Sequence, residues 1–213
     1  MIDLATLRTD VQAHLGPSVG LGVADPTAPV DGLFPIEVSA TGRMVDKRKR
    51  EFAAGRKAAR HAMRMIGLPV VSVPMGADRA PQWPGGLRGS ISHCASAALA
   101  VTAKQPKVRA LGIDVEENDP LEQPLWDTIL TPAECARTTN GQDAKRIFCA
   151  KEAVYKAQYP ITGQRLDFQD LEVTLDGSRF SARTTREVET WPTVTKGALI
   201  HSQNLFLGLV VVA

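Results

Sequence analysis

The segment Leu111–Glu116 constrains the fold of this 213-residue chain most strongly, because apolar and polar positions alternate along it. A period of two is typical of a β-strand with one buried face. Leu111, Ile113 and Val115 would then enter the core, whereas Asp114 and Glu116 would project together from the opposite face. Their Cα atoms would lie roughly 7 Å apart. The sequence therefore predicts a strand that carries two carboxylates on one side.

Two carboxylates on one face of a strand provide ligands for a hard cation. Mg²⁺ relieves the repulsion between Asp114 and Glu116, takes oxygen ligands, and usually keeps waters or substrate phosphate oxygens in its shell. Mn²⁺ accepts the same oxygen ligands, so the identity of the metal stays open. An ordinary solvent-facing strand edge is the alternative, and an Asp-x-Glu pair alone does not distinguish the two.

Periodicity elsewhere predicts an α+β fold with two halves joined just before Leu111. Apolar residues on one side of a helical wheel predict a long amphipathic helix over residues 41–66, bent near Gly55. A second helix is expected over 143–158, and Thr131 is expected to cap a short one. Further strands are expected at residues 70–73, 90–94, 97–103, 171–175, 179–184 and 205–212, with a hairpin turn at Asp176-Gly177.

Composition limits the class of protein. With 44% hydrophobic residues the chain can bury a full core, and its three cysteines lack the C-x-x-C spacing of a zinc site. The first residues do not resemble a signal peptide, and the longest apolar run, 205–213, is too short to cross a bilayer. We therefore expect a cytoplasmic protein with no membrane partner. A net charge of +2 is too small to identify a nucleic-acid binder.

The helix expected over 143–158 places Glu152 and Lys156 one turn apart, on the side opposite its apolar stripe. Such a pair is also a common surface feature, which stabilises a helix by about 0.2–0.5 kcal/mol. The pair indicates a functional site only in combination with the acidic strand.

The helix expected over 41–66 is strongly basic. Arg48 and Arg56 are eight residues apart, which puts them on one face about 12 Å apart along the axis. Arginine suits bidentate contacts with phosphate, although a solvated basic face is the alternative. A nucleic-acid-binding module that uses helix 43–64 explains these residues and nothing else, and only 5% of the residues are aromatic.

Considered together, Gly112–Glu116 and Phe148–Ala157 resemble the two signature motifs of 4′-phosphopantetheinyl transferases. Ser90–Cys94 and Arg48–Arg60 resemble the siderophore-synthase and actinobacterial branch of the surfactin-type subfamily. The resemblance implies two similar α/β halves related by a pseudo-twofold axis, with coenzyme A in the cleft between them. Residues 1–108 would form the half on the 3′-phosphate side, and residues 109–213 the half with the metal and the catalytic groups.

The resemblance also implies roles for residues of the second half. Asp114, Glu116 and Glu152 would hold the metal, with the coenzyme A diphosphate completing its shell. Asp114, Glu152 and Lys156 would be catalytic, with Glu152 or a metal-held water as the base. Lys156 would also offset the charge of the diphosphate.

In the first half, the resemblance implies that Arg48, Arg56 and His93 reach the 3′-phosphate end of coenzyme A, with Ser92 beside them. Relatives often carry a lysine in the loop before the Trp-Pro pair. Here the loop 75–81 has Arg79 instead, at a shifted position.

The activity implied is the Mg²⁺-dependent transfer of 4′-phosphopantetheine from coenzyme A to a serine hydroxyl of an apo acyl or peptidyl carrier protein. The second product would be 3′,5′-ADP, and we expect a monomer that does not bind nucleic acid. Fatty acid, polyketide and nonribosomal peptide systems all remain open as the source of the carrier. Another Mg²⁺-dependent phosphohydrolase or nuclease, with water as the acceptor, is the alternative enzyme class.

Overall fold

A computed structural model describes residues 2–213. Contacts within the chain divide it into two compact units. The first unit contains the residues up to Leu111 together with Val212 and Ala213, and the second contains Gly112–Val211. Helices and strands occur in both units, which confirms the α+β class. None of the helices among residues 2–213 is long and apolar enough to cross a membrane.

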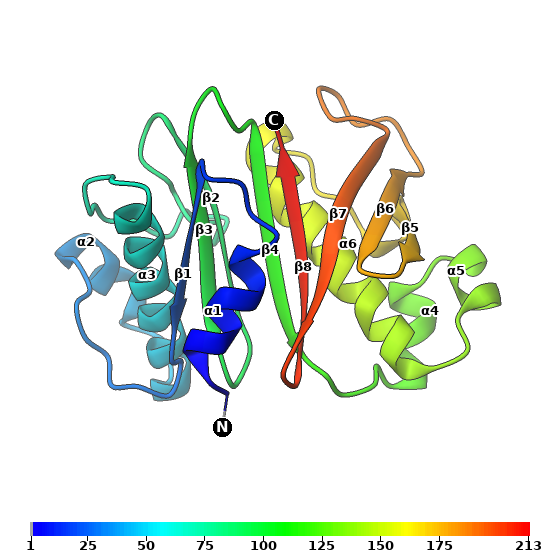
Figure 1. The fold of residues 1–213 in the computed structure, drawn as a ribbon, viewed down its shortest axis with the longest axis horizontal. Coiled ribbons are helices and arrows are strands. Elements are labelled where there is room, and N and C mark those ends of the chain that lie inside the picture. The colour runs from blue at the N-terminus through cyan, green and yellow to red at the C-terminus, as the bar shows by residue number, and fades with distance from the viewer. Residues whose placement is uncertain (1) are drawn as a thin grey trace. The chain divides into compact units, whose positions relative to one another are not determined.

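The first unit is a three-stranded antiparallel sheet with a long helix packed on it (Figure 1). The strand order is β1-β3-β2. Its elements are α1 (Leu4–Gln12), β1 (Val19–Ala24), α2 (Pro35–Val38), the 3-10 helix η1 (Ser39–Thr41), α3 (Asp46–Met65), β2 (Leu87–His93) and β3 (Ala98–Lys104).

Small residues bring α3 and β1 into backbone contact. A Cβ atom added to Gly22 would lie 1.9 Å from the carbonyl oxygen of Ala58, and one added to Gly20 would lie 2.1 Å from that of Ala62. Because no side chain separates the two elements, the alanine-rich face of α3 is buried against the sheet.

The second unit contains a five-stranded sheet with the order β4-β8-β7-β6-β5. Helix α6 runs along this sheet in Figure 1. The elements are β4 (Ala110–Glu117), which begins at the end of the first unit, η2 (Gln123–Leu125), α4 (Trp126–Ile129), α5 (Pro132–Arg137), α6 (Gly141–Thr162), η3 (Phe168–Asp170), β5 (Leu171–Asp176), β6 (Arg179–Thr184), β7 (Val194–Ser202) and β8 (Leu205–Val212).

Several local predictions are confirmed. The hairpin of β2 and β3, the strand β4 and the hairpin of β5 and β6 all form where the alternation predicts them. Thr131 caps α5 as predicted: its hydroxyl accepts a hydrogen bond from the Glu134 amide, and Glu134 accepts one from the Thr131 amide. Neither α1 nor β7 is among the elements that the sequence pattern predicts.

The strand predicted at residues 70–73 is wrong. Within residues 2–213 this segment forms no strand, and at Val73 side chains take the place of a neighbouring strand. The Val73 amide donates to Glu37 Oε1 at 2.8 Å, and its carbonyl accepts from Arg56 Nε at 3.0 Å. The first long helix also begins later than predicted, at Asp46, since residues 39–41 form a 3-10 turn and Val45 is extended. α6 is longer at both ends than the predicted 143–158.

We expect Gly112→Ala to destabilise the protein. A Cβ at this position would lie 1.9 Å from the Ala153 carbonyl oxygen, so α6 would have to move away from β4. Overpacking of this kind costs about 1–3 kcal/mol or more, measurable as a lower Tm in thermal unfolding. Gly42→Ala is the control, because Gly42 has helical backbone angles and its Cβ would meet nothing within 4 Å. Equal Tm values for the two variants would contradict the packing argument.

Candidate active site

Asp114 lies beneath helix α6 and is only 2% exposed. Its Oδ1 accepts from Lys156 Nζ at 2.5 Å. The prediction that Lys156 lies on the side of the helix away from the core is therefore wrong, because the lysine turns toward β4 and pairs with a buried carboxylate. The absence of a side chain at Gly112 lets α6 approach the strand closely enough for this contact.

Glu116 is half-buried one pleat further along β4 and pairs with a lysine that the sequence analysis missed. Lys145 Nζ lies 3.4 Å from Glu116 Oε2 and 3.4 Å from Asp119 Oδ1. Lys145 precedes Glu152 by two turns on α6, so this spacing was the signal available in the sequence. Each carboxylate of the β4 pair thus has a lysine from α6 beside it.

Burial and mutual repulsion shift the proton affinities of these acids. Burial raises the pKa of Glu116 to about 7, the charge of Asp114 adds to the shift, and Lys145 opposes it. Burial also raises the pKa of Glu152. The charge of Lys156 opposes this shift, and the charge of Asp114 adds to it. For Lys156, burial favours the neutral form, but Asp114 and Glu152 outweigh it and raise its pKa. These five residues therefore form one electrostatically coupled cluster.

A divalent cation suits the chemistry of this cluster, since it would relieve the repulsion that raises the pKa of Glu116. The three carboxylates predicted as ligands, on Asp114, Glu116 and Glu152, belong to facing elements. Among residues 2–213, however, no group of three or more His, Cys, Asp or Glu side chains is arranged to hold a metal ion. Lys156 and Lys145 lie beside Asp114 and Glu116, so the lysine side chains have to move before these carboxylates can bind a metal ion.

Glu152 also lines a cavity of about 430 Å³ within the second unit. The other lining residues are Lys151, Tyr155, Arg165, Leu166, Asp167, Phe168, Asp170 and Leu171. Helix α6 thus presents Glu152 both to the acidic cluster on β4 and to an open space beside η3.

In the first unit, the structure brings together two residues predicted to bind phosphate. Arg48 Nη1 is hydrogen-bonded to His93 Nε2. Glu51, which the sequence analysis missed, joins them, with Oε2 3.3 Å from Arg48 Nη1 and 3.9 Å from His93 Nδ1. Its position three residues after Arg48 on α3 was the available signal. A guanidinium, an imidazole and a carboxylate thus form a compact set.

Arg56 is more deeply placed than a surface phosphate ligand and is only 7% exposed. Its Nε donates to the Val73 carbonyl, and its guanidinium stacks over the Phe52 ring at 3.9 Å. Burial lowers its pKa to about 10, Glu37 opposes the shift, and the charge of Arg48 adds to it. Arg56 therefore supports the packing of α3 and also contributes charge beside Arg48.

The two remaining predicted contacts lie on different elements. Ser92 is buried on β2 next to His93. Arg79 is exposed in the turn closed by the Met75–Pro81 bridge and has a positive φ of 69°. The structure records no contact of Arg79 with Arg48 or His93 among the described residues, so its role stays a prediction.

Comparison with known proteins gives the family. The 4′-phosphopantetheinyl transferase N-terminal domain matches residues 37–103, and the 4′-phosphopantetheinyl transferase superfamily domain matches residues 110–204. The 4′-phosphopantetheinyl transferase Svp of Streptomyces mobaraensis is 38% identical over 167 residues, which cover 74% of this chain and 68% of Svp. The chain belongs to the 4′-phosphopantetheinyl transferase superfamily. It is an enzyme of this type, as the signature motifs indicated.

Other relatives of this phosphopantetheinyl transferase confirm the branch. The 4′-phosphopantetheinyl transferase PptT of Mycobacterium tuberculosis is 38% identical over 152 residues, 68% of this chain and 67% of PptT. Enterobactin synthase component D of Escherichia coli is 42% identical over 118 residues, 52% of this chain and 55% of that protein. The chain is thus similar both to actinobacterial transferases and to a siderophore-synthase component.

We expect the stability of the metal-free transferase to fall as the pH rises from about 4.5 to about 7, in part because of Glu116. Its pKa in the folded protein is raised, so the folded state binds more protons than the unfolded state in this window. In Glu116→Gln this contribution disappears, and the decline in Tm between pH 5 and pH 8 should be smaller than in the wild type. Mg²⁺ should raise the wild-type Tm more at pH 8 than at pH 6. Parallel pH profiles for the two proteins would contradict the raised pKa.

Proposed function

We propose that this transferase moves 4′-phosphopantetheine from coenzyme A to a serine hydroxyl of an apo acyl or peptidyl carrier protein, releasing 3′,5′-ADP. Coenzyme A as the donor follows from membership of the family. The observation that carries the proposal is the coupled cluster on β4 and α6, in which Lys156 is held on Asp114 beside Glu116 and Glu152. Such a cluster combines ligands for a cation, a proton acceptor and a fixed positive charge.

Asp114, Glu116 and Glu152 would hold Mg²⁺, or Mn²⁺ in its place. When bound, the metal supplies neutralisation of the charge on the diphosphate oxygens. The carboxylates contribute oxygen ligands of the kind that both ions prefer. Lys145 would leave Glu116 and pair with Asp119 alone, which it already approaches at 3.4 Å.

Glu152 and Lys156 would handle the proton and the charge of the leaving group. The serine oxygen forms a bond to the phosphorus that carries pantetheine, and the bond from that phosphorus to the oxygen of 3′,5′-ADP breaks. Glu152, whose pKa is raised by burial, takes the serine proton directly or through a water. Lys156 stays protonated, because neighbouring carboxylates raise its pKa, and offsets the negative charge that develops on 3′,5′-ADP.

Arg48 and His93 would bind the 3′-phosphate of coenzyme A. Arg48 donates to His93 Nε2, so the guanidinium and the imidazole lie side by side, and Arg56 adds charge near Arg48. Glu51 contacts both groups, so the phosphate would replace an anion that is already present. Ser92 and Arg79 are proposed as further contacts of the nucleotide.

The carrier protein is proposed by class alone. Carrier proteins present acidic helices, and the net charge of +2 is compatible with docking without selecting among fatty acid, polyketide and nonribosomal peptide systems. We propose that the enzyme is a monomer.

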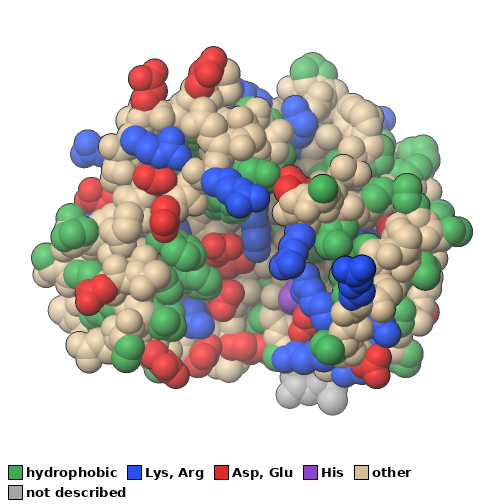
Figure 2. Space-filling view, turned by 180° about the vertical axis from the view of Figure 1, so that it is seen from behind, with side chains coloured by type: hydrophobic (Ala, Val, Ile, Leu, Met, Phe, Trp, Pro, Cys, Tyr) green, Lys and Arg blue, Asp and Glu red, His purple; other side chains and the backbone are tan. Residues whose placement is uncertain are grey.

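A nucleic-acid-binding role for residues 43–64 has less support than the transferase. Arg56 and Arg60 are buried, and lysines of α3 pair with carboxylates: Lys49 with Asp46 at 3.5 Å and Lys57 with Asp31 at 3.4 Å. Figure 2 shows acidic side chains exposed beside basic ones on one face of the molecule.

The proposed transfer is tested by intact mass measurement of an apo carrier protein incubated with the enzyme, coenzyme A and Mg²⁺. We expect the carrier to gain the mass of one phosphopantetheine. Asp114→Asn should abolish the gain by removing a metal ligand and the partner of Lys156, and Glu152→Gln should abolish it while coenzyme A still binds. Products released without modification of the carrier would indicate a phosphohydrolase instead, and near-normal turnover by Glu152→Gln would remove Glu152 from the mechanism.

A second prediction concerns the 3′-phosphate. We expect Arg48→Ala to raise the KM for coenzyme A by roughly 10–100-fold, the size of a lost charge-assisted hydrogen bond. The same variant should use dephospho-coenzyme A, which lacks the 3′-phosphate, about as well as the wild type does. Lys49→Ala is the matched control, since Lys49 is a neighbouring cation paired with Asp46. If Arg48→Ala lost as much activity with dephospho-coenzyme A as with coenzyme A, Arg48 would lie outside the 3′-phosphate site.

A further inference from the structure

Lys151 directly precedes Glu152 on α6, but its side chain is directed into the interior and is only 1% exposed. Its ammonium donates to Glu134 Oε2 at 2.7 Å, to the Ile129 carbonyl at 2.7 Å and to the Phe168 carbonyl at 2.8 Å. An ammonium has three N–H donors, and here all three have an acceptor within the protein. Lys151 is therefore occupied by protein groups and is not placed to contact the diphosphate.

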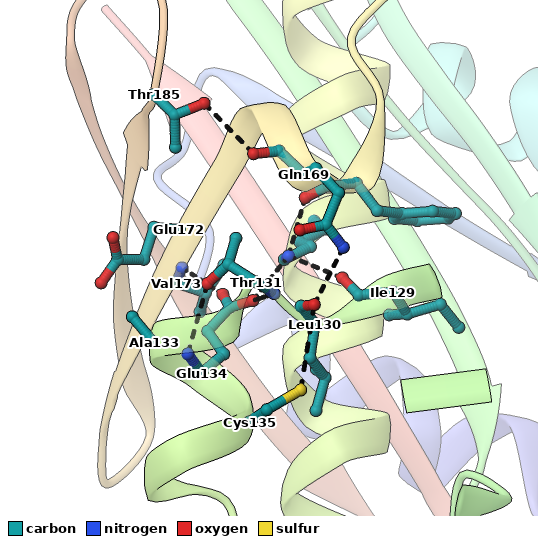
Figure 3. A network of polar contacts seen from close by, with 12 residues as sticks. Ile129, Leu130, Thr131, Ala133, Glu134, Cys135, Gln169, Glu172, Val173 and Thr185 are labelled. Carbon is teal, nitrogen blue, oxygen red and sulfur yellow. Dashed lines mark hydrogen bonds and ion pairs between the residues drawn. The ribbon is translucent and has the colours of Figure 1, made fainter. Parts of the chain in front are cut away.

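The partner of Lys151 is equally fixed. Glu134 is fully buried, and its carboxylate also accepts from the amides of Thr131 at 2.7 Å and Val173 at 2.6 Å (Figure 3). Close by, Gln169 Nε2 donates to the Leu130 carbonyl at 2.9 Å. These contacts join α6, the start of α5, η3 and the start of β5 into one rigid group.

The first unit contains a corresponding ion pair. Glu37 is fully buried in α2, and Arg60 Nη1 on α3 donates to its Oε2 at 3.1 Å. The Glu37 carboxylate also accepts from the amides of Phe34 at 2.9 Å and Val73 at 2.8 Å. In both units, a glutamate in the first turn of a short helix binds its own N-cap amide, a valine amide beyond the long helix, and a cation on that helix.

The correspondence extends along both long helices. With Arg60 aligned to Lys151, Ala62 corresponds to Ala153, and the carbonyl oxygens of both alanines lie closest to a glycine of the first strand of their unit. The same alignment places His61 at the position of Glu152 and Met65 at that of Lys156. The first unit thus has the buried ion pair but lacks counterparts of Glu152 and Lys156.

We propose that Lys151 is a positioning residue for phosphopantetheinyl transfer, a role that rests on the proposed function. Its three hydrogen bonds fix the rotation of α6 at the turn that carries Glu152. They also hold the Phe168 backbone, and Phe168 lines the same cavity as Glu152. Loss of the ammonium would free both, and a displacement of about 1 Å in such a site can lower the rate on the order of 100-fold.

The experiment compares Lys151→Met with Arg60→Met, which each remove the cation of a buried ion pair. Both variants should have a lower Tm. Only Lys151→Met should lower kcat, by about 10–100-fold with little change in KM for coenzyme A, and only it should weaken Mn²⁺ binding measured by titration of the protein without substrate. Lys151→Arg, a second variant in case Lys151→Met does not fold, should recover Tm more than kcat, because a planar guanidinium does not match three acceptors arranged around an ammonium.

Equal effects of Lys151→Met and Arg60→Met on kcat and on Mn²⁺ affinity would overturn the positioning role and leave Lys151 with a role in stability alone. A Lys151→Arg variant with wild-type kcat and Mn²⁺ affinity would overturn the requirement for three fixed donors. A wild-type protein that binds Mn²⁺ but does not modify the carrier would overturn the proposed function instead, and the Mn²⁺ affinities would still decide the role of Lys151.

Discussion

The backbone contact between helix α6 and strand β4 at Gly112 determines the chemistry of the second unit. Without a Cβ atom at this position, the Ala153 carbonyl reaches the strand, and the next residue on the same face, Asp114, is covered by the helix. Carboxylates that would be hydrated on an open strand edge are therefore held in a poorly solvated layer. This explains why burial is the main cause of the raised pKa values of Glu116 and Glu152.

Buried acids of this kind need compensation, and α6 supplies it from the same face. Lys156 pairs with Asp114, and Lys145 pairs with Glu116, so each charge transferred from water meets an opposite charge. Removing one member of such a pair leaves an uncompensated charge in the interior. The cluster is therefore suited to a divalent ion, which would take over from Lys145 the compensation of the charge on Glu116.

Local pattern predicted much of this fold, and long-range contacts account for the errors. The alternation of apolar and polar residues was sufficient to predict β4, and capping chemistry was sufficient to predict that Thr131 begins a helix. In the false strand at 70–73, the backbone of Val73 is bonded to side chains on α2 and α3, and no local pattern reveals such partners. Apolar periodicity placed Lys156 on the outer side of α6, since it takes no account of a buried carboxylate that attracts a lysine inward. The Glu134–Lys151 pair was missed for the same reason.

The matching ion pairs of the two units also bear on how the chain arose. Glu37 with Arg60 and Glu134 with Lys151 occupy equivalent places around a long helix, although one cation is arginine and the other lysine. Gene duplication of a single ancestral module would leave this record: the internal electrostatic framework persists in both copies, while neighbouring positions diverge, to His61 in one and Glu152 in the other. The buried ion pair is thus common to both units, whereas the acidic residues of the candidate active site belong to the second unit alone.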